Sequence, residues 1–196
     1  MINCNYYNET VFNNLDLSAQ EILLLKSIND FYSNDIYFNL LENIINGTSE
    51  VSRRTFEYFV TNYVMTHNIS YEIIENGIKT NFVVYNSYKD QLKAHHKKYF
   101  DPFGRGDRIP FFSKNNCIIT TIGQLNFYRW FFSKKLYDYC IAKYSDIQGE
   151  LVINKNNIKK TNKKQIKIIQ NIKKQVNYVK IDFTTSKNNN IVVSFD

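Results

Sequence analysis

The residues best suited to contact a ligand are gathered in the run YKDQLKAHHKKYFDPFGRGDRI, from Tyr88 to Ile109. This run combines basic side chains, two adjacent histidines, aromatic rings and two of the six glycines of the chain. Its basic residues are Lys89, Lys93, Lys97, Lys98, Arg105 and Arg108. Lysine and arginine neutralise phosphate groups, and aromatic rings can stack on unpaired bases. The run therefore indicates binding of an anionic ligand, above all a nucleic acid, more than it indicates catalysis.

The lysines of this run have helical spacing. On a helix, Lys89, Lys93 and Lys97 lie at successive four-residue steps and form one basic face. Arg105 and Arg108 follow in a loop that contains glycine, from which they can contact the same phosphate backbone. The opposing interpretation is a lysine face that is merely solvated. For the two arginines, neither interpretation is favoured over the other.

Aromatic residues interrupt the basic run in the segment FDPF. Phe100 and Phe103 can stack on bases, or they can fill the hydrophobic core together with Pro102. Of these two interpretations we favour the core. Pro102 is also expected to end the structured segment before it.

The two histidines are the one candidate for catalysis. His95 and His96 lie near Asp90 and Asp101 in the sequence. Because neighbouring helical residues point about 100° apart, the two imidazoles cannot share a site on one helix face. The sequence also has no GxSxG, Walker, GxGxxG, HExxH or DxDxDG motif. We therefore predict solvated or phosphate-contacting histidines, no catalytic residue, no bound metal, no cofactor and no enzymatic activity.

A second polar and aromatic group follows in the segment TTIGQLNFYRW. Thr121 and Gln124 have the spacing of a capping box, so the Gln124 side chain is expected to complete a helix cap. Arg129 and Asn126 can face a ligand, and we include Arg129 among the predicted nucleic-acid contacts. The alternative for Arg129 is an ion pair with a surface acid.

The positive charge of the chain is concentrated near its C-terminal end. The net charge is +7, and residues 151–181 contain nine lysines and no acidic residue. Such a segment attracts nucleic acid, an anionic membrane or an acidic protein without choosing among them, and it can also be merely solvated. The lysines predicted to contact nucleic acid here are Lys163, Lys164, Lys167, Lys173 and Lys174.

Composition limits the class of protein. The 196 residues suffice for one large domain or for a domain with an appendage, and 43% of them are hydrophobic, enough for a core. Three widely spaced cysteines fit a reducing compartment and have no zinc-ligand spacing. No signal peptide and no apolar run of 18 residues is present, so we expect a soluble, intracellular protein without a transmembrane segment.

Hydrophobic periodicity predicts three helices in the first third of the chain. They span about residues 18–32, 35–46 and 52–66, and their apolar faces are expected to form core. Ser18 and Glu21 form a capping box at the first helix. Two extended runs between residues 71 and 85 follow, joined by Asn76 and Gly77, which tolerate positive φ and so predict a hairpin.

The rest of the chain alternates in the same way. We expect helices at about residues 87–96, 121–133 and 136–144, with an extended pair over 108–119. Residues 154–165 are the best linker candidate, followed by a basic amphipathic helix over 166–176 and a terminal hairpin over 178–195. The predicted fold class is α+β with more helix than sheet, in two domains, residues 1–150 and 151–196.

Three segments resemble a known family. The run YKDQLKAHHKKYFDPFGRGDRI, followed by TTIGQLNFYRWFFSKKLYDYC, is similar to uncharacterised proteins of nucleocytoplasmic large DNA viruses, including the mimiviruses. Their pattern has a lysine-containing helix, an FDPF-type turn followed by basic residues, and a TTxGQLNF helix. SRRTFEYFVTNYVMTHNISYEI resembles the upstream part, and the closing VSFD resembles the end. In this chain Gly104, Gly106 and Asp107 dilute the basic cluster. The resemblance implies a viral protein of the host cytoplasm, and it implies no activity.

Two functional hypotheses follow. The first is a non-enzymatic viral protein that binds nucleic acid, with DNA ahead of RNA, in genome organisation, packaging or viral gene expression. The second is a structural or scaffold protein of the virion or viral factory, whose basic tail binds an acidic viral protein. Both hypotheses place the protein in the viral factory of the host cytoplasm or in the virion.

Overall fold

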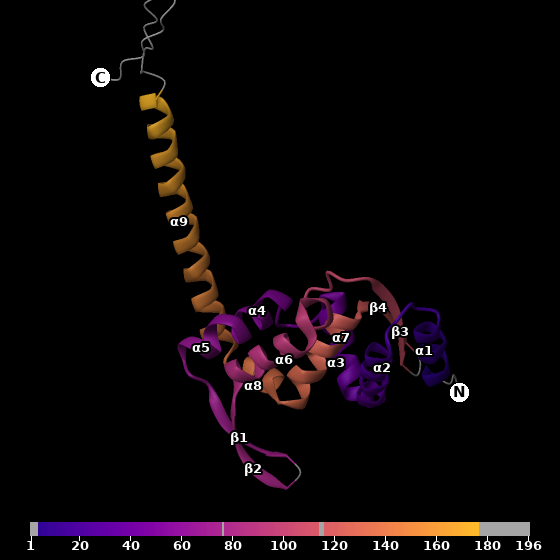
Figure 1. Ribbon diagram of the computed structural model, residues 1–196. Coiled ribbons are helices and arrows are strands. Elements are labelled where there is room, and N and C mark those ends of the chain that lie inside the picture. Colours follow the sequence, from indigo (N-terminus) through magenta and orange to yellow (C-terminus); the bar gives the residue numbers. More distant parts are fainter. Residues whose placement is uncertain (1–3, 76, 114–115, 177–196) are drawn as a thin grey trace, which may run out of the picture. The chain divides into compact units, whose positions relative to one another are not determined.

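The computed structural model describes residues 4–75, 77–113 and 116–176 (Figure 1). The chain divides into two units, Met1–Leu151 and Val152–Asp196. Within the described residues the fold is mostly helical, with two small antiparallel hairpins. The predicted α+β class with more helix than sheet is thus confirmed. The predicted terminal hairpin lies outside the described residues.

The helical elements are α1 (Cys4–Asn13), α2 (Ala19–Tyr32), α3 (Asp35–Asn46), α4 (Arg53–Tyr58), the π-helical segment η1 (Phe59–Tyr63), α5 (Val64–Thr66), α6 (Val84–Tyr99), α7 (Ile122–Ser133), α8 (Leu136–Ala142) and α9 (Tyr144–Val176). The strands are β1 (Ser70–Glu75), β2 (Ile78–Val83), β3 (Arg108–Ser113) and β4 (Asn116–Thr121). Each hairpin pairs consecutive strands, with Glu75 opposite Ile78 and Ser113 opposite Asn116.

The predicted starts and ends of α2 and α3 are confirmed. The backbone N–H of Glu21 donates to the Ser18 hydroxyl, and the backbone N–H of Ser18 donates to the Glu21 carboxylate at 2.6 Å, which is the predicted capping box. Gly47 ends α3 in the left-handed conformation with φ 77°. The prediction that the apolar face of α3 forms core is wrong for one residue. Ile36 is 68% exposed, because it lies in the first turn of α3, before the buried Phe38.

The predicted hairpin at residues 71–85 is confirmed as β1 and β2, and Gly77 has the expected positive φ of 78°. The helix that follows begins earlier than the predicted residue 87. The strand ends at Val83, and α6 begins at Val84, whose backbone N–H donates to the Ile69 carbonyl at 3.2 Å. This long-range hydrogen bond starts the helix, although no side chain caps it.

Helix α7 forms the centre of the core. All of its residues from Ile122 to Phe132 are buried except Arg129, which is half-buried. A helix that is buried on nearly all sides is surrounded by other elements. Accordingly α7 packs against α6 on one side and α2 on another, as Figure 1 shows.

The sequence patterns did not predict α1. This helix packs on β3, and the fully buried side chain of Asn8 attaches it there. The carboxamide of Asn8 donates to the Phe112 carbonyl at 2.8 Å and accepts from the Phe112 N–H at 2.8 Å. It also donates to the Asn29 side chain at 2.8 Å. Asn8 therefore acts toward β3 as a neighbouring strand would, a role that hydrophobic periodicity cannot reveal.

The predicted linker over residues 154–165 is wrong. These residues belong to α9, which is helical without interruption from Tyr144 to Val176. Asparagine and lysine gave the segment its low complexity, but neither glycine nor proline follows Gly149 within the helix. Lysine, glutamine and isoleucine tolerate helix well, so the composition does not break it.

Candidate functional site

The FDPF turn is part of the core, as favoured. Phe100 is 2% exposed, and its ring centroid lies 5.2 Å from that of Phe127 and 5.5 Å from that of Trp130. Pro102 is buried as well. Phe103 is half-buried and has the Arg105 guanidinium 5.4 Å from its ring centroid. Phe100 therefore cannot stack on a base.

The turn is tied to the start of α7 by hydrogen bonds, and we call the segments 99–105 and 120–126 together the interlock. The Asp101 N–H donates to the Gly123 carbonyl at 3.1 Å. The Asn126 carboxamide donates to the Tyr99 carbonyl at 2.9 Å. These contacts join two motifs that lie about twenty residues apart in the sequence. The polar residues of the GQLNF motif thus position the turn.

Gln124 does not complete the helix cap, and that prediction is wrong. The Thr121 hydroxyl caps α7 by accepting from the Gln124 N–H at 3.1 Å. The buried carboxamide of Gln124 instead accepts from the Thr120 hydroxyl at 3.2 Å and donates to the Pro102 carbonyl at 3.1 Å. The reason is that the buried site offers one donor and one acceptor, which a carboxamide satisfies together.

Two glycines allow the interlock to close. A Cβ atom on Gly104 would lie 2.4 Å from Oε1 of Gln124, and Gly104 has a positive φ of 65°. A Cβ atom on Gly123 would lie 3.0 Å from the Lys98 carbonyl. Both positions therefore require glycine for packing, and Gly104 requires it for its backbone conformation as well.

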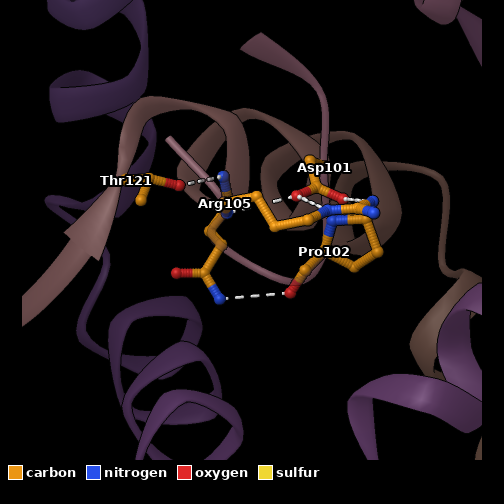
Figure 2. Close-up of polar contacts among 5 residues, drawn as sticks. Asp101, Pro102, Arg105 and Thr121 are labelled. Carbon is orange, nitrogen blue, oxygen red and sulfur yellow. Dashed lines mark hydrogen bonds and ion pairs between the residues drawn. The ribbon is translucent and has the colours of Figure 1, made fainter. Parts of the chain in front are cut away.

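Arg105 forms a bidentate ion pair with Asp101 (Figure 2). Its Nη2 lies 2.7 Å from Oδ1 of Asp101, and its Nε lies 3.1 Å from Oδ2. The Asp101 side chain is 7% exposed and that of Arg105 is 63% exposed. Burial raises the pKa of Asp101, but the hydrogen bonds and charge of Arg105 outweigh it and leave the pKa below its ordinary value. The positive charge of Arg105 is thus compensated within the turn.

The basic face predicted on α6 is interrupted. His96 has φ 53° and ψ 172°, which are not helical, so the chain kinks there. Lys89 and Lys93 share a helix face, but Lys97 follows the kink, and its predicted place on the same stripe is wrong. After the kink, the Tyr99 carbonyl accepts from Asn126, and Phe100 enters the core.

The other lysines of the run have weak partners. Lys93 lies 4.0 Å from Asp90, and both side chains are largely exposed. Lys98 lies 3.8 Å from Glu21 and 4.7 Å from the ring centroid of Tyr99. Lys89 lies 5.7 Å from the ring centroid of Tyr85. Exposed pairs of this kind contribute little, and they leave the lysines available to a ligand.

Lys97 and Arg108 complete the set of cations in the run. Both are exposed, and neither forms an ion pair with any residue that the structure describes. Arg108 begins β3, directly after the interlock. Arg105, which is paired with Asp101, therefore lies close in the sequence to two cations that have no such partner in the described residues.

Arg129 lies where α7 meets α2 and α6. Its Nη1 donates to the Ser27 hydroxyl at 2.5 Å, and its Nη2 donates to the Asn126 carboxamide at 2.9 Å. The predicted alternative of an ion pair with a surface acid is wrong for the described part of the chain, because both partners are neutral. Burial lowers the pKa of the guanidinium, an effect that Tyr32 opposes.

His95 is half-buried and stacks against Phe100, with ring centroids 6.4 Å apart. Burial, and then the charge of Arg129, lower the pKa of its imidazole. His96 is exposed. Across residues 4–75, 77–113 and 116–176, no group of three or more His, Cys, Asp or Glu side chains is placed to hold a metal ion.

The C-terminal lysines that we predicted as contacts all lie on α9. They are Lys163, Lys164, Lys167, Lys173 and Lys174. Residues 152–176 of this helix hold eight lysines and no acidic residue. None of the helices in the described ranges combines the length and the apolar character that a membrane span requires.

Comparisons with known proteins agree with the resemblance seen in the sequence. The model of a family of unknown function, DUF7197, matches residues 4–196. The uncharacterized protein L507 of Acanthamoeba polyphaga mimivirus is 34% identical over an alignment of 185 residues, and this alignment covers 87% of this chain and 71% of that protein. No solved structure matches the chain. The resemblance to uncharacterised giant-virus proteins is thereby confirmed, and this chain belongs to the DUF7197 family.

Proposed function

We propose that this protein is not an enzyme and that it binds the phosphate backbone of nucleic acid, DNA ahead of RNA. The observation that carries the proposal is the continuous helix α9, whose residues 152–176 hold eight lysines and no acidic residue. A lysine on a helix is commonly neutralised by an acid three or four positions away. Over these residues that neutralisation is impossible, because no acid is available.

The length of this segment suits a polyanion. At about 1.5 Å per residue, 25 helical residues extend over roughly 38 Å. Double-stranded DNA carries about one negative charge per 1.7 Å along its axis, so many phosphates lie within reach of such a helix. Lysines that have no acidic partner in the same segment can displace the counterions of those phosphates. The release of the counterions supplies the binding free energy.

A second group of cations belongs to the first unit. Lys89, Lys93, Lys97 and Arg108 are exposed, and their partners are weak or, among the described residues, missing. They support backbone contacts and not base-specific recognition, because lysine meets phosphate as a point charge. The proposal therefore expects binding with little dependence on nucleotide sequence.

The viral relative suggests the setting. A giant-virus protein with such a surface would serve genome organisation, packaging or viral gene expression, in the viral factory of the host cytoplasm or in the virion. These roles rest on the affinity for nucleic acid, which is the property to measure first.

The test uses the full-length protein and fluorescence anisotropy on duplex DNA and on RNA, over a series of salt concentrations. Changing Lys163, Lys164, Lys167, Lys173 and Lys174 together to glutamine keeps helix propensity nearly constant. We expect the slope of log affinity against log salt to become shallower by up to about 4.5. The matched control changes the same five lysines to arginine and should keep the slope.

Two results would contradict the proposal. One is the absence of binding by the wild-type protein at about 50 mM salt, where backbone contacts are strong. The other is an unchanged salt slope in the glutamine variant, which would remove α9 from the interface.

A second candidate function is association with an acidic viral protein as a scaffold. It is favoured by Ile166 and Ile169 on α9, which are 54% and 53% exposed. Apolar residues beside lysines suit a protein partner better than a phosphate backbone. Under this alternative, changing both isoleucines to glutamine weakens binding to a peptide rich in glutamate and leucine, and the wild-type protein does not bind DNA.

A further inference from the structure

The environment of Arg129 differs from those of the cations in the run from Tyr88 to Ile109. Arg129 belongs to α7, Ser27 belongs to α2, and the Asn126 carboxamide connects Arg129 to the Tyr99 carbonyl at the end of α6. The guanidinium is therefore fixed at a junction of three helices. Ser27 is exposed, so the junction is open to solvent on that side.

The charge of Arg129 has no counter-charge in the described residues. A guanidinium has five N–H donors, and its hydrogen bonds here reach two neutral oxygen atoms, the Ser27 hydroxyl and the Asn126 carboxamide. Partial burial of a cation without an anion is unfavourable. An anion that entered the junction would remove this cost, and the remaining N–H groups could donate to it.

One further donor lies beside the guanidinium. The Ser27 hydroxyl accepts from Arg129, so its own O–H is left to donate. The charge of Arg129 also lowers the pKa of the His95 imidazole on α6, after burial, so this imidazole can report a change of charge at Arg129. Tyr32 is the remaining ionisable group near Arg129, and its hydroxyl donates to the Leu125 carbonyl at 3.0 Å.

We propose that Arg129 and Ser27 form a binding site for a single phosphate group, and that His95 serves as the reporter of its occupancy. The inference rests on the proposed function, since the phosphate would belong to the nucleic-acid backbone, and free orthophosphate shares its chemistry. The phosphate oxygens accept from the guanidinium and from the Ser27 hydroxyl. The negative charge reverses the electrostatic effect of Arg129 on His95, so the imidazole gains affinity for a proton.

The experiment follows the three histidines of the full-length protein by NMR titration. Orthophosphate is compared with chloride at equal ionic strength, and His95 is assigned with the His95→Gln variant. We expect phosphate to raise the pKa of His95 saturably, by roughly half a pH unit or more. His67, which pairs with Glu150, and the exposed His96 are internal references whose resonances should show no phosphate-specific response.

A variant links the effect to Arg129. In Arg129→Gln the phosphate response of His95 should disappear, while Arg129→Lys should retain part of it. The wild-type titration stands alone if either variant fails to fold. A pKa of His95 that ignores phosphate, or that moves together with those of both other histidines, would overturn the site.

A second arm replaces orthophosphate with a short DNA duplex. A response of His95 to orthophosphate without any binding of the duplex keeps the site and removes the proposed function. Binding of the duplex with an unchanged pKa of His95 keeps the proposed function and overturns the site.

Discussion

The interlock and helix α9 are the two parts of this protein that look most suited to binding, and they differ in how their polar groups are used. In the interlock, Arg105 is paired with Asp101, and Gln124 and Asn126 bond to backbone carbonyls. Over residues 152–176 of α9, eight lysines have no acid in the same segment. Charge in the interlock is satisfied internally, whereas residues 152–176 of α9 contain no acidic residue that could compensate their lysines within the segment.

The difference shows that the residues of a recognisable motif can have a structural role and need not contact a ligand. The FDPF turn and the GQLNF helix are the segments that mark the resemblance to the viral family, yet most of their polar side chains hold one segment to the other. Lys97 and Arg108, which lie near these motifs in the sequence, are exposed and form no ion pair in the described residues. Distinctive motif residues in this fold therefore position a surface that other residues supply.

The strongest test of this comparison is a substitution that opens the interlock. Gly104→Ala should destabilise the protein by about 2–4 kcal/mol, because the added Cβ atom meets Gln124 and the positive φ is unfavourable for alanine. Urea unfolding followed by circular dichroism measures the loss.

Gly47→Ala is the matched control. Gly47 has a similar φ of 77°, but nothing lies within 4 Å of its Cβ position, so the loss should be only about 1–2 kcal/mol. In a Gln124→Ala background the steric part of the Gly104→Ala effect should vanish. Equal losses for the two glycines would show that the interlock is not tightly packed.

The next effect concerns the ion pair inside the interlock. Asp101→Asn should cost about 1–2 kcal/mol at pH 7, since it removes the charge from two hydrogen bonds with a partly exposed arginine. The folded pKa of Asp101 lies below its ordinary value, so its contribution is present above about pH 4 and is lost as the pH falls through the folded pKa. The difference in unfolding free energy between wild type and variant should therefore shrink in acid, and a difference independent of pH would contradict this role.

The local structure was largely predictable from the sequence, because it depends on neighbouring residues. Ser18 and Glu21 cap α2, and Gly77 turns the first hairpin, since both signals act over three or four positions. The kink at His96 and the attachment of α1 through Asn8 could not be predicted. Both are accompanied by contacts far along the chain: Tyr99, after the kink, accepts from Asn126, and Asn8 donates to Phe112.

The sequence predicted which cations could belong to the candidate site, but it did not predict which of them are paired with other residues. Residue type identified Arg105, Arg108 and Arg129 as equal candidates. The structure separates them by their partners, a carboxylate for Arg105, neutral oxygen atoms for Arg129, and no ion pair in the described residues for Arg108. A carboxylate four positions before Arg105 was a local signal for its pairing, and nothing near Arg129 in the sequence indicated Ser27.

The smallest expected effect tests whether a cation that is already paired with an acid contributes to DNA binding. Arg108→Gln should make the salt slope of DNA binding shallower by about 1, as expected for one lost phosphate contact. The double variant Asp101→Asn/Arg105→Gln removes one charge of each sign, so its net charge is unchanged and its slope should equal that of the wild type. Fluorescence anisotropy over a salt series measures both. If the double variant loses as much slope as Arg108→Gln, Arg105 exchanges its carboxylate for phosphate on binding, and the interlock belongs to the interface.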